Sequence, residues 1–537
     1  MNTMGYDFKD VFIPAGTLSF AFRVSCEDTV YGPHPEHLSM ERSGNRTVCR
    51  AGMLTGAGGQ ISREGSFEIH IEEKKDRITL WAKACHGSKK CLRMLVLVKG
   101  MDIREMEFDS VNVNRLTYAK GRGTPRISYP GRTPMMPLVF IHGNDGKRWF
   151  ALSKDAKIRQ KVFCAQPDPI SGEPLLLLTH SEDARFITNT LEMPEWHFGV
   201  DFESKSIVSE HLEDLRTNHG LEYYRDRRKP VWVDDIRLVA LFHGTHWTGH
   251  VFSTFLQMEE MAEWVCRRMD AGQVLFFLPA WDGDYYRTYP YHEPAERMGG
   301  AEGLLRLVKT CHRLGARIIP MLGGPNLAVT TFLEEHDMMD AVLKTAAGHP
   351  KVQDWVDWNN DLVREAEGYI MNFGHPRYLR HMVDSSSALV DRYGFDGIFL
   401  DGAIRWENAP DHSPYEGLKA WSSEMREKHP DILLMGEDGY DAQWGLFDMF
   451  GTFECPLGLE NGFLAYSRMA HYLAYPGPDG SCGIHEQAWN PEGVKKAIPG
   501  YTIPTMSFTR NGFLNHKAEL EEQLKRATEW RMDAYEK

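Results

Sequence analysis

Two carboxylates stand where the chain could carry out acid–base or nucleophilic chemistry. Asp401 ends the apolar run GIFLD, and Glu437 ends the run LLMGE. The segment between them has the length of one helix and its connections, so we expect the two runs to be neighbouring parallel strands. Two carboxylates that flank a glycosidic bond can cleave it, because one attacks or stabilises the sugar carbon while the other protonates the leaving oxygen. The alternative is that each acid only caps the helix that follows it.

The end of another apolar run adds residues that suit a sugar ligand. The run QVLFFLPA is followed by Trp281 and Asp282, and then by the aromatic-rich segment YYRTYPYHEP. An aromatic ring can stack on the apolar face of a sugar, and a carboxylate beside it can accept hydrogen bonds from hydroxyl groups. We therefore expect Trp281 and Asp282 to line a sugar pocket. An aromatic loop that merely packs on the rim of the fold is the alternative.

The apolar run IRLVALF is followed by the segment HGTHWTGH, which contains His243, His246 and Trp247. Histidines three residues apart could bind a metal ion, but no third ligand stands at a familiar spacing. We expect these residues to bind substrate and expect no metal or other cofactor. Six residues after later apolar runs are further pocket candidates: Asn326, Arg405, Trp406, Asp438, Glu454 and His485. Glu454 would be the acid if Glu437 is only structural.

The elements that would position these residues alternate between strand and helix after Pro230. Apolar runs alternate with amphipathic stretches such as AEGLLRLVKTCHRLG, which ends in a glycine typical of a helix stop. About eight such units in roughly 300 residues predict a (β/α)8 barrel, in which catalytic side chains come from the C-terminal ends of strands. An open doubly wound sheet is the competing architecture, but no G-x-G-x-x-G follows the first run. The strand candidates are 236–242, 273–280, 316–323, 396–402, 432–438 and 446–454, with weaker ones near 483–489 and 502–508.

The first part of the chain has a different pattern. Short apolar runs with period-two alternation, such as SFEIHIEE, are separated by turn residues. Many such strands predict an antiparallel β-sandwich. We interpret the charged segment YYRDRRKP, closed by Pro230, as the linker. The chain is therefore predicted to divide near residues 222–232, into a β-sandwich of residues 1–228 and a (β/α)8 TIM barrel of residues 229–537.

The segments around the two carboxylates resemble a known family. RYGFDGIFLDGA, followed by ILLMGED, is similar to the fourth- and fifth-strand motifs of the α-amylase superfamily and related retaining glycoside hydrolases. This resemblance implies that Asp401 is the nucleophile and Glu437 the general acid/base of a retaining glycosidase. Phe399 stands where the amylase pattern has arginine, and the His-Asp pair expected after strand seven is missing. The sequence therefore looks like an outlying barrel glycosidase with an N-terminal β-sandwich, as in dextranase-like and galactosidase-like families.

Composition and charge exclude some kinds of partner. The net charge of −14 disfavours binding to nucleic acid, which usually depends on clustered Lys and Arg. The first residues show no basic segment followed by an apolar stretch, and no apolar run is long enough to span a bilayer. The nine cysteines include no CxxC pair, so we expect reduced thiols and a cytoplasmic location.

Two other classes of function remain open at this stage. One is a non-catalytic carbohydrate-binding protein, which would be expected to lose one of the two carboxylates. The other is a barrel lyase, metal-dependent hydrolase or aldolase, which would need a lysine at a strand end or a cluster of metal ligands. The sequence leaves the sugar, the linkage, the anomer and the oligomeric state open.

Overall fold

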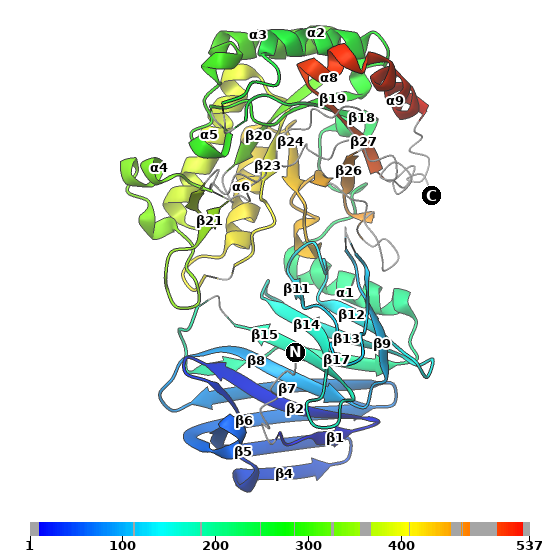
Figure 1. The fold of residues 1–537 in the computed structure, drawn as a ribbon, viewed down its shortest axis with the longest axis vertical. Helices are drawn as coiled ribbons and strands as arrows, with labels where there is room; N and C mark the ends of the chain where they lie inside the picture. The colour runs from blue at the N-terminus through cyan, green and yellow to red at the C-terminus, as the bar shows by residue number, and fades with distance from the viewer. Residues whose placement is uncertain are drawn as a thin grey trace.

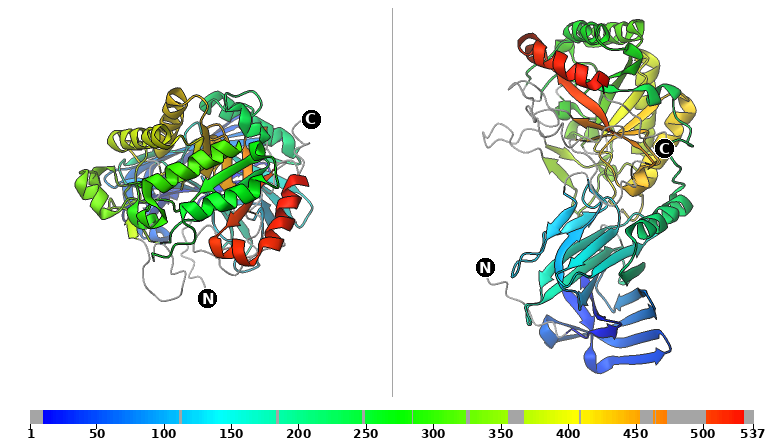
Figure 2. Two further views of the ribbon diagram at one scale, coloured as in Figure 1. Left: turned by 90° about the horizontal axis from the view of Figure 1, so that it is seen from above. Right: turned by 90° about the vertical axis from the view of Figure 1, so that its right-hand side faces the viewer.

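The computed structural model describes residues 10–110, 113–182, 185–246, 249–283, 285–323, 327–354, 367–407, 409–452, 463, 465–472 and 502–529. An antiparallel sheet structure comes first in the chain, and a closed parallel barrel follows it. The predicted fold class, a β-sandwich followed by a (β/α)8 barrel, is thereby confirmed. The two parts lie end to end, with the sandwich below the barrel in Figure 1 and in the side view of Figure 2.

The N-terminal sheet is antiparallel and folds into two layers. One series of paired strands runs β11–β14–β15–β8–β2 and the other runs β12–β13–β17–β7–β6. Aromatic side chains join the layers: Phe20 lies 5.2 Å from Phe198, and Phe163 lies 5.7 Å from Trp196, between ring centroids. The strands are β1 (Ile13–Ala15), β2 (Leu18–Cys26), β3 (Val30–Pro33), β4 (Leu38–Ser43), β5 (Arg46–Gly56), β6 (Ile61–Lys74), β7 (Arg77–His86), β8 (Cys91–Lys99), β9 (Ile103–Glu107), β10 (Arg115–Thr117), β11 (Ile127–Tyr129), β12 (Leu138–Gly143), β13 (Arg148–Lys154), β14 (Lys161–Pro167), β15 (Pro174–Ser181), β16 (Thr190–Glu192) and β17 (Glu195–Val200).

The connection between the two parts is packed rather than a loose linker. After β17 the chain forms helix α1 (Ser204–His219), which the period-two pattern of this region did not predict. The charged segment taken as the linker is partly buried. Arg227 lies inside it and donates hydrogen bonds to the carbonyl oxygens of Trp444 (2.7 Å) and Phe447 (2.6 Å). This segment is therefore anchored to the barrel.

Eight parallel strands form the barrel, which closes because β18 pairs with both β19 and β27. The strands are β18 (Leu238–Phe242), β19 (Val274–Leu278), β20 (Arg317–Gly323), β23 (Gly397–Asp401), β24 (Leu433–Glu437), β25 (Met449–Thr452), β26 (Arg468–Tyr472) and β27 (Thr502–Phe508). The helices around them are α2 (Phe255–Cys266), α3 (Gly300–Leu314), α4 (Thr330–Glu335), α5 (Pro376–Tyr393), α6 (Pro414–Lys428), α8 (Arg510–Asn515) and α9 (Lys517–Glu529). A small sheet of β21 (Val352–Asp354) and β22 (Glu367–Tyr369) lies between β20 and α5.

Most barrel strands lie where the apolar runs predict them. The six strong candidates correspond to β18, β19, β20, β23, β24 and β25, and the run 502–508 is β27. The seventh strand is β26, a short segment of sequence RMAHY that lacks a continuous apolar run. The candidate near 483–489 lies outside the described residues.

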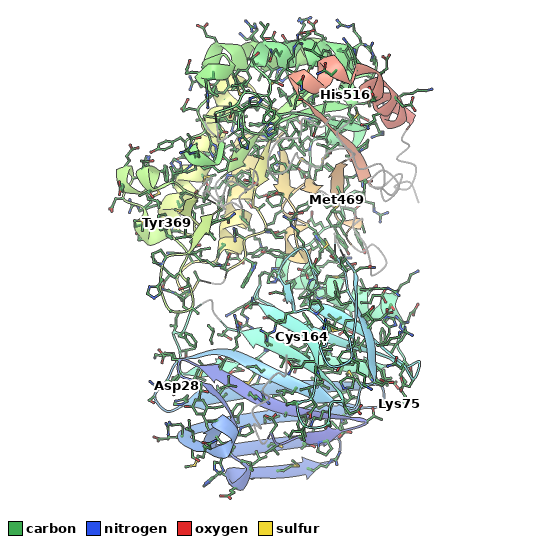
Figure 3. The ribbon with its side chains drawn as sticks, viewed as in Figure 1. Asp28, Lys75, Cys164, Tyr369, Met469 and His516 are labelled. Atoms are coloured by element: carbon green, nitrogen blue, oxygen red, sulfur yellow. The ribbon has the colours of Figure 1, made fainter. Side chains whose placement is uncertain are left out.

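Alternate residues of the barrel strands form two separate cores. Every second residue of a strand points into the barrel, and these buried residues include Leu241, Phe277, Met321, Phe399 and Met435. The residues between them, such as Leu400 and Leu434, pack against the surrounding helices. Burial on both faces explains why these strands are continuously apolar in sequence. Figure 3 draws the side chains of both parts on the ribbon, with Met469 labelled on β26 of the barrel and Cys164 on β14 of the sandwich. None of the described helices has both the length and the apolarity needed to cross a membrane.

Candidate active site

Asp401 and Glu437 occupy adjacent positions at one end of the barrel. The fourth strand, β23, ends at Asp401 and the fifth, β24, ends at Glu437. The two strands are in register, because Phe399 is paired with Met435 and both side chains lie in the barrel interior. Side chains two positions further along the strands return to the same face. Both carboxylates are thus placed over the interior of the barrel at its C-terminal end, where active sites of such barrels lie.

The two carboxylates differ in their surroundings. The side chain of Asp401 is buried at 1% exposure, whereas that of Glu437 is partly exposed. One carboxylate oxygen of Glu437 accepts a hydrogen bond from the backbone N–H of Gly402, at 3.0 Å. Since Gly402 directly follows Asp401, this bond ties the end of the fifth strand to the end of the fourth. A buried carboxylate beside an accessible one suits a nucleophile beside a proton donor.

The floor beneath the pair is aromatic. The rings of Phe399 and Phe277 lie 4.6 Å apart between centroids, and both are fully buried. Gly451 on β25 permits this packing, because a Cβ atom there would lie only 2.7 Å from the ring of Phe399. Phe399 occupies the position of the arginine in the amylase pattern, so an apolar ring replaces a cation below Asp401.

Trp281 and Asp282 are buried in the barrel wall rather than exposed at a pocket. The indole N–H of Trp281 donates a hydrogen bond to the carbonyl of Met321 (2.8 Å), and no part of the ring is accessible. Asp282 is hydrogen-bonded to His292 at 2.8 Å, and burial raises the pKa of its carboxyl group. In this structure neither side chain presents a surface to a sugar. A buried ring with a satisfied N–H is typical of packing.

Tyr289 enters the barrel mouth from the aromatic-rich segment and was not singled out in the sequence. It is fully buried and packs within the interior core of the barrel. Its ring lies above Gly323, the last residue of β20, so closely that a Cβ atom at position 323 would be 1.7 Å from it. The sequence signals this contact only by a glycine at the end of the third strand and by four tyrosines that follow the second strand.

His243 and His246 lie at the end of β18 as neutral, buried imidazoles. Burial lowers the pKa of His243 to about 3 and that of His246 to about 4, with the neighbouring histidines acting in the same direction. The ring of His243 packs edge-on against Phe252 at 4.6 Å. Neutral imidazoles can donate and accept hydrogen bonds, so these residues suit contacts with uncharged groups. No group of three or more potential metal ligands occurs among the residues that the structure describes.

Asp438 connects the site to the sandwich. It is buried, adopts a positive φ of 51°, and pairs with the guanidinium of Arg132 at 2.7 Å. Arg132 lies in the connection between β11 and β12 of the sandwich. The sequence placed Asp438 in the pocket as a polar neighbour of Glu437. In the structure its carboxylate pairs with the other part of the chain.

A second sandwich contact holds the same loop. The buried carboxylate of Asp441 accepts hydrogen bonds from the hydroxyl of Tyr129 (2.9 Å) and from the ring of His211 (2.6 Å). Tyr129 ends β11 and His211 lies on α1. The loop that follows Glu437 is therefore fixed by three side chains of the sandwich part, a feature that no pattern in the sequence indicated.

Arg405 and Trp406 follow Asp401 on the loop after β23. Arg405 is hydrogen-bonded to Gln353 and lies 3.4 Å from Glu407, which also pairs with Lys351 at 2.5 Å. These contacts join the loop to the segment that follows the third strand. Four other predicted pocket residues lie outside the described residues: Trp247, Asn326, Glu454 and His485.

Comparison with known proteins finds the same architecture in glycosidases. No family model matches the sequence. An α-N-acetylgalactosaminidase from Bifidobacterium bifidum has a similar structure, with a TM-score of 0.63 and 12% identity over 96% of this chain and 93% of that one. An α-galactosidase from Lactobacillus brevis gives a TM-score of 0.50 and 11% identity over 96% and 73% of the two chains.

One curated relative is found by sequence, the 1,4-α-glucan branching enzyme of Rhizobium etli. It is 24% identical over 212 residues, which cover 37% of this chain and 26% of that enzyme. The chain thus spans only about a quarter of the length of this relative. At these identities the solved structures establish the shared fold. The sandwich-plus-barrel architecture that the strand motifs indicated is the architecture found in known barrel glycosidases.

Proposed function

We propose that this protein is a retaining glycoside hydrolase, with Asp401 as nucleophile and Glu437 as general acid/base. The observation that carries the proposal is the placement of these carboxylates, in register on neighbouring strands over the barrel interior and joined through the N–H of Gly402. The fold shared with glycosidases supports the same reaction class.

The strand geometry favours retention of configuration. Adjacent strands are about 4.8 Å apart, so in-register side chains that face the same way start from that spacing. Retaining carboxylate pairs lie about 5–5.5 Å apart, whereas inverting pairs need about 6.5–9.5 Å to admit a water molecule. A pair on neighbouring strands fits the shorter separation.

The proposed reaction has two steps. A carboxylate oxygen of Asp401 attacks the anomeric carbon while Glu437 gives its proton to the glycosidic oxygen, so the bond to the leaving group breaks and a glycosyl ester forms. Glu437 then removes a proton from water, which attacks the same carbon and releases Asp401. The apolar floor of Phe399 and Phe277 keeps water away from the inner face of Asp401, which strengthens electrostatic interactions with the positive transition state.

The test compares leaving groups in two variants. Asp401→Ala should nearly abolish turnover of every substrate. Glu437→Ala should slow glycosides with poor leaving groups by about 10²–10⁴-fold, the usual contribution of acid catalysis, but affect aryl glycosides far less. Azide should restore turnover of the aryl substrates in Glu437→Ala. Aryl α-N-acetylgalactosaminide, α-galactoside and α-glucoside are the first substrates to try, because proteins similar to this chain are described as acting on such sugars.

The control is Glu416→Ala, which removes an exposed carboxylate from the first turn of α6 and should leave all rates unchanged. Normal activity of Glu437→Ala on a natural glycoside would place the acid elsewhere. Glu454, two residues beyond the end of β25, would then be substituted next. An inverted product, measured by NMR during the reaction, would contradict the retaining mechanism.

A further inference from the structure

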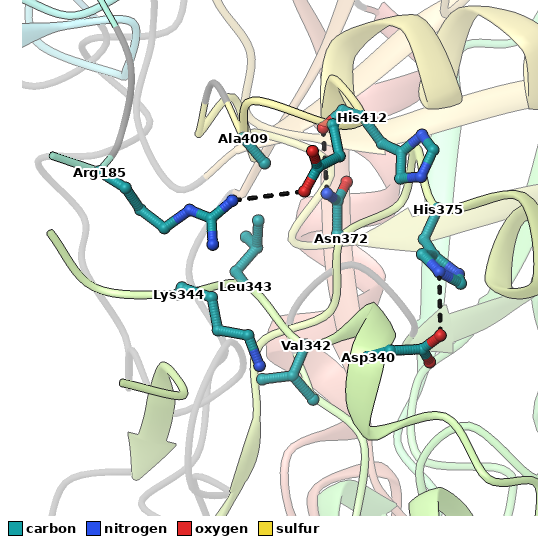
Figure 4. Close-up of a pocket in the computed structure, with 10 residues that line it drawn as sticks. Arg185, Asp340, Val342, Leu343, Lys344, Asn372, His375, Ala409 and His412 are labelled. Atoms are coloured by element: carbon teal, nitrogen blue, oxygen red, sulfur yellow. Dashed lines mark hydrogen bonds and ion pairs between the residues drawn. The ribbon is translucent and has the colours of Figure 1, made fainter. Parts of the chain in front are cut away.

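A cavity of about 230 Å³, lined by both polar and apolar side chains, lies where the sandwich meets the C-terminal end of the barrel (Figure 4). Arg185 of the sandwich forms one wall. The segment after the third barrel strand and the loop after the fourth strand form the others. The remaining lining residues are Asp340, Val342, Leu343, Lys344, Asn372, His375, Ala409, Asp411 and His412.

A second cavity, of about 560 Å³, adjoins the first and shares Arg185 and Asp411 with it. Its lining adds Glu27, Phe186, Ile187, Ala346, Ala347, Gly348 and Pro410. The two walls are tied together, because the backbone N–H of Phe186 in the sandwich donates to the carbonyl of Ala346 in the barrel (3.2 Å). We call the two cavities together the boundary groove.

The side chains of the boundary groove combine opposite charges with apolar faces. The guanidinium of Arg185 lies 3.3 Å from the carboxylate of Asp411, and His375 lies 3.4 Å from Asp340. Phe186 and Ile187 are partly exposed beside them. Because the charges nearly balance, the groove does not select a strongly charged ligand. Polar groups that both donate and accept, set among apolar faces, suit a ligand rich in hydroxyl groups.

The groove is part of the same loop system as the proposed catalytic pair. The loop that supplies Ala409, Asp411 and His412 begins at Asp401 and Gly402. It is braced against the segment after the third strand by the pair of Glu407 with Lys351. The loop that begins at Asp401 therefore also supplies a wall of the groove.

We propose that the boundary groove binds sugar residues that lie beyond the bond being cleaved, so that the natural substrate is an oligosaccharide or glycan chain. The proposal rests on the proposed glycosidase function. Binding energy from remote parts of a substrate can be used to lower the barrier at the reacting bond, which makes long substrates better than short ones.

The experiment compares a short and a long substrate that share the glycosyl group to be released and its anomeric configuration. For an α-galactosyl enzyme these are 4-nitrophenyl α-galactoside and raffinose, and for an α-glucosyl enzyme they are 4-nitrophenyl α-glucoside and maltotriose. Arg185→Ala should lower kcat/KM for the trisaccharide about tenfold, the effect of losing a hydrogen bond to a charged group. It should leave kcat/KM for the aryl glycoside unchanged.

Two further variants sharpen the result. Lys344→Ala removes another cation from the lining and should show the same selective loss, which keeps the test valid if Arg185→Ala folds poorly. Arg50→Ala on β5, at the far end of the sandwich in Figure 1, removes an arginine with a similar ion pair and should change neither rate. Equal effects on both substrates, or none on the trisaccharide, would overturn the proposal.

Failure of the proposed function is recognised separately. If the wild-type protein cleaves neither substrate, calorimetric titration with raffinose and with maltotriose tests the groove alone. Binding that Arg185→Ala weakens would then support a glycan site in a protein without this activity. Absence of binding to both trisaccharides would overturn the groove proposal, whereas the proposed function is judged by cleavage of the three aryl glycosides.

Discussion

At the scale of single residues, side-chain alternation decides which groups can react. Asp401 and Glu437 lie two residues beyond Phe399 and Met435, whose side chains point into the barrel, and they therefore face the same side. Their placement over the barrel interior therefore follows from strand register. The rigid strands hold the two carboxylates, while the loops beyond them carry contacts to the sandwich and to the boundary groove.

The contact between Gly323 and Tyr289 gives a prediction at this scale. Gly323→Ala would place a methyl group inside the ring of Tyr289 and force the ring out of the barrel mouth. We expect a loss of about 1–3 kcal/mol in the free energy of unfolding, typical of overpacking, together with reduced activity. In a Tyr289→Ala background the same substitution should change stability little. Denaturant unfolding of the four proteins in this double-mutant cycle measures the coupling.

A coupling energy near zero would show that the ring does not rest on Gly323. A suitable control is Gly52→Ala in the sandwich, where a Cβ atom would meet nothing within 4 Å. Neither Gly52 nor Gly323 has a positive φ, so the control adds a methyl group without a clash and isolates the steric effect.

At the scale of elements, the sequence predicts strands better than their surroundings. Barrel strands buried on both faces leave continuous apolar runs, so seven of the eight could be located from sequence. The seventh, β26, contains Arg468 and His471 and gives no such run. Helix α1 follows a strand-rich region and buries only a few apolar residues, so its sequence carries only a weak amphipathic pattern.

The candidate site shows the same limit. Strand ends could be read from the sequence, and they supplied Asp401 and Glu437. The period of two does not extend into loops, so the sequence could not show that Trp281 packs in the wall while Tyr289 enters the mouth. Contacts between distant segments, such as Arg132 with Asp438, depend on tertiary docking and leave no local pattern.

The loop after β24 gives a prediction at the element scale. Asp441→Ala would leave the hydroxyl of Tyr129 and the ring of His211 buried without their carboxylate. Breaking a buried pair of this kind costs about 3–5 kcal/mol, so the unfolding midpoint in denaturant should fall markedly. Because the loop begins directly after Glu437, we also expect kcat to fall with little change in KM.

Asp145→Ala serves as the control, since it removes a partly exposed carboxylate at a sandwich turn. If Asp441→Ala lost stability but kept the kcat of the wild type, the contact would join the two parts without positioning Glu437. Rescue of kcat by Asp441→Asn, which can still accept the hydrogen bond from Tyr129, would support the positioning role.

At the scale of the whole molecule, the sandwich belongs to the structure of the site. Arg132, Tyr129 and His211 hold the loop after Glu437, and Arg185 forms a wall of the boundary groove. The sandwich also contains buried ionisable groups, so the stability of the folded chain depends on pH.

Buried histidines should make the protein sensitive to acid between about pH 6.5 and pH 4. Burial, together with nearby Lys161, lowers the pKa of His180 from 6.5 to about 4. Below pH 6.5 the unfolded chain takes up a proton at this residue, while the folded protein does so only near pH 4. Stability is therefore full above pH 6.5 and falls as the pH drops to 4, by up to about 3 kcal/mol for a shift of this size.

The measurement is the free energy of unfolding in urea at several pH values, for the wild type, His180→Gln and His37→Gln. His180→Gln should flatten the decline between pH 6.5 and 4, whereas His37→Gln changes an exposed histidine and should leave the slope as in the wild type. Below pH 4.5 all three proteins should lose further stability, because Glu210 takes up a proton in the unfolded chain before it does so in the folded protein. Its pKa is about 2, because the bonds from Arg77 and Lys154 outweigh the effect of burial. An unchanged slope in His180→Gln would show that His180 takes up its proton in the folded protein as readily as in the unfolded chain.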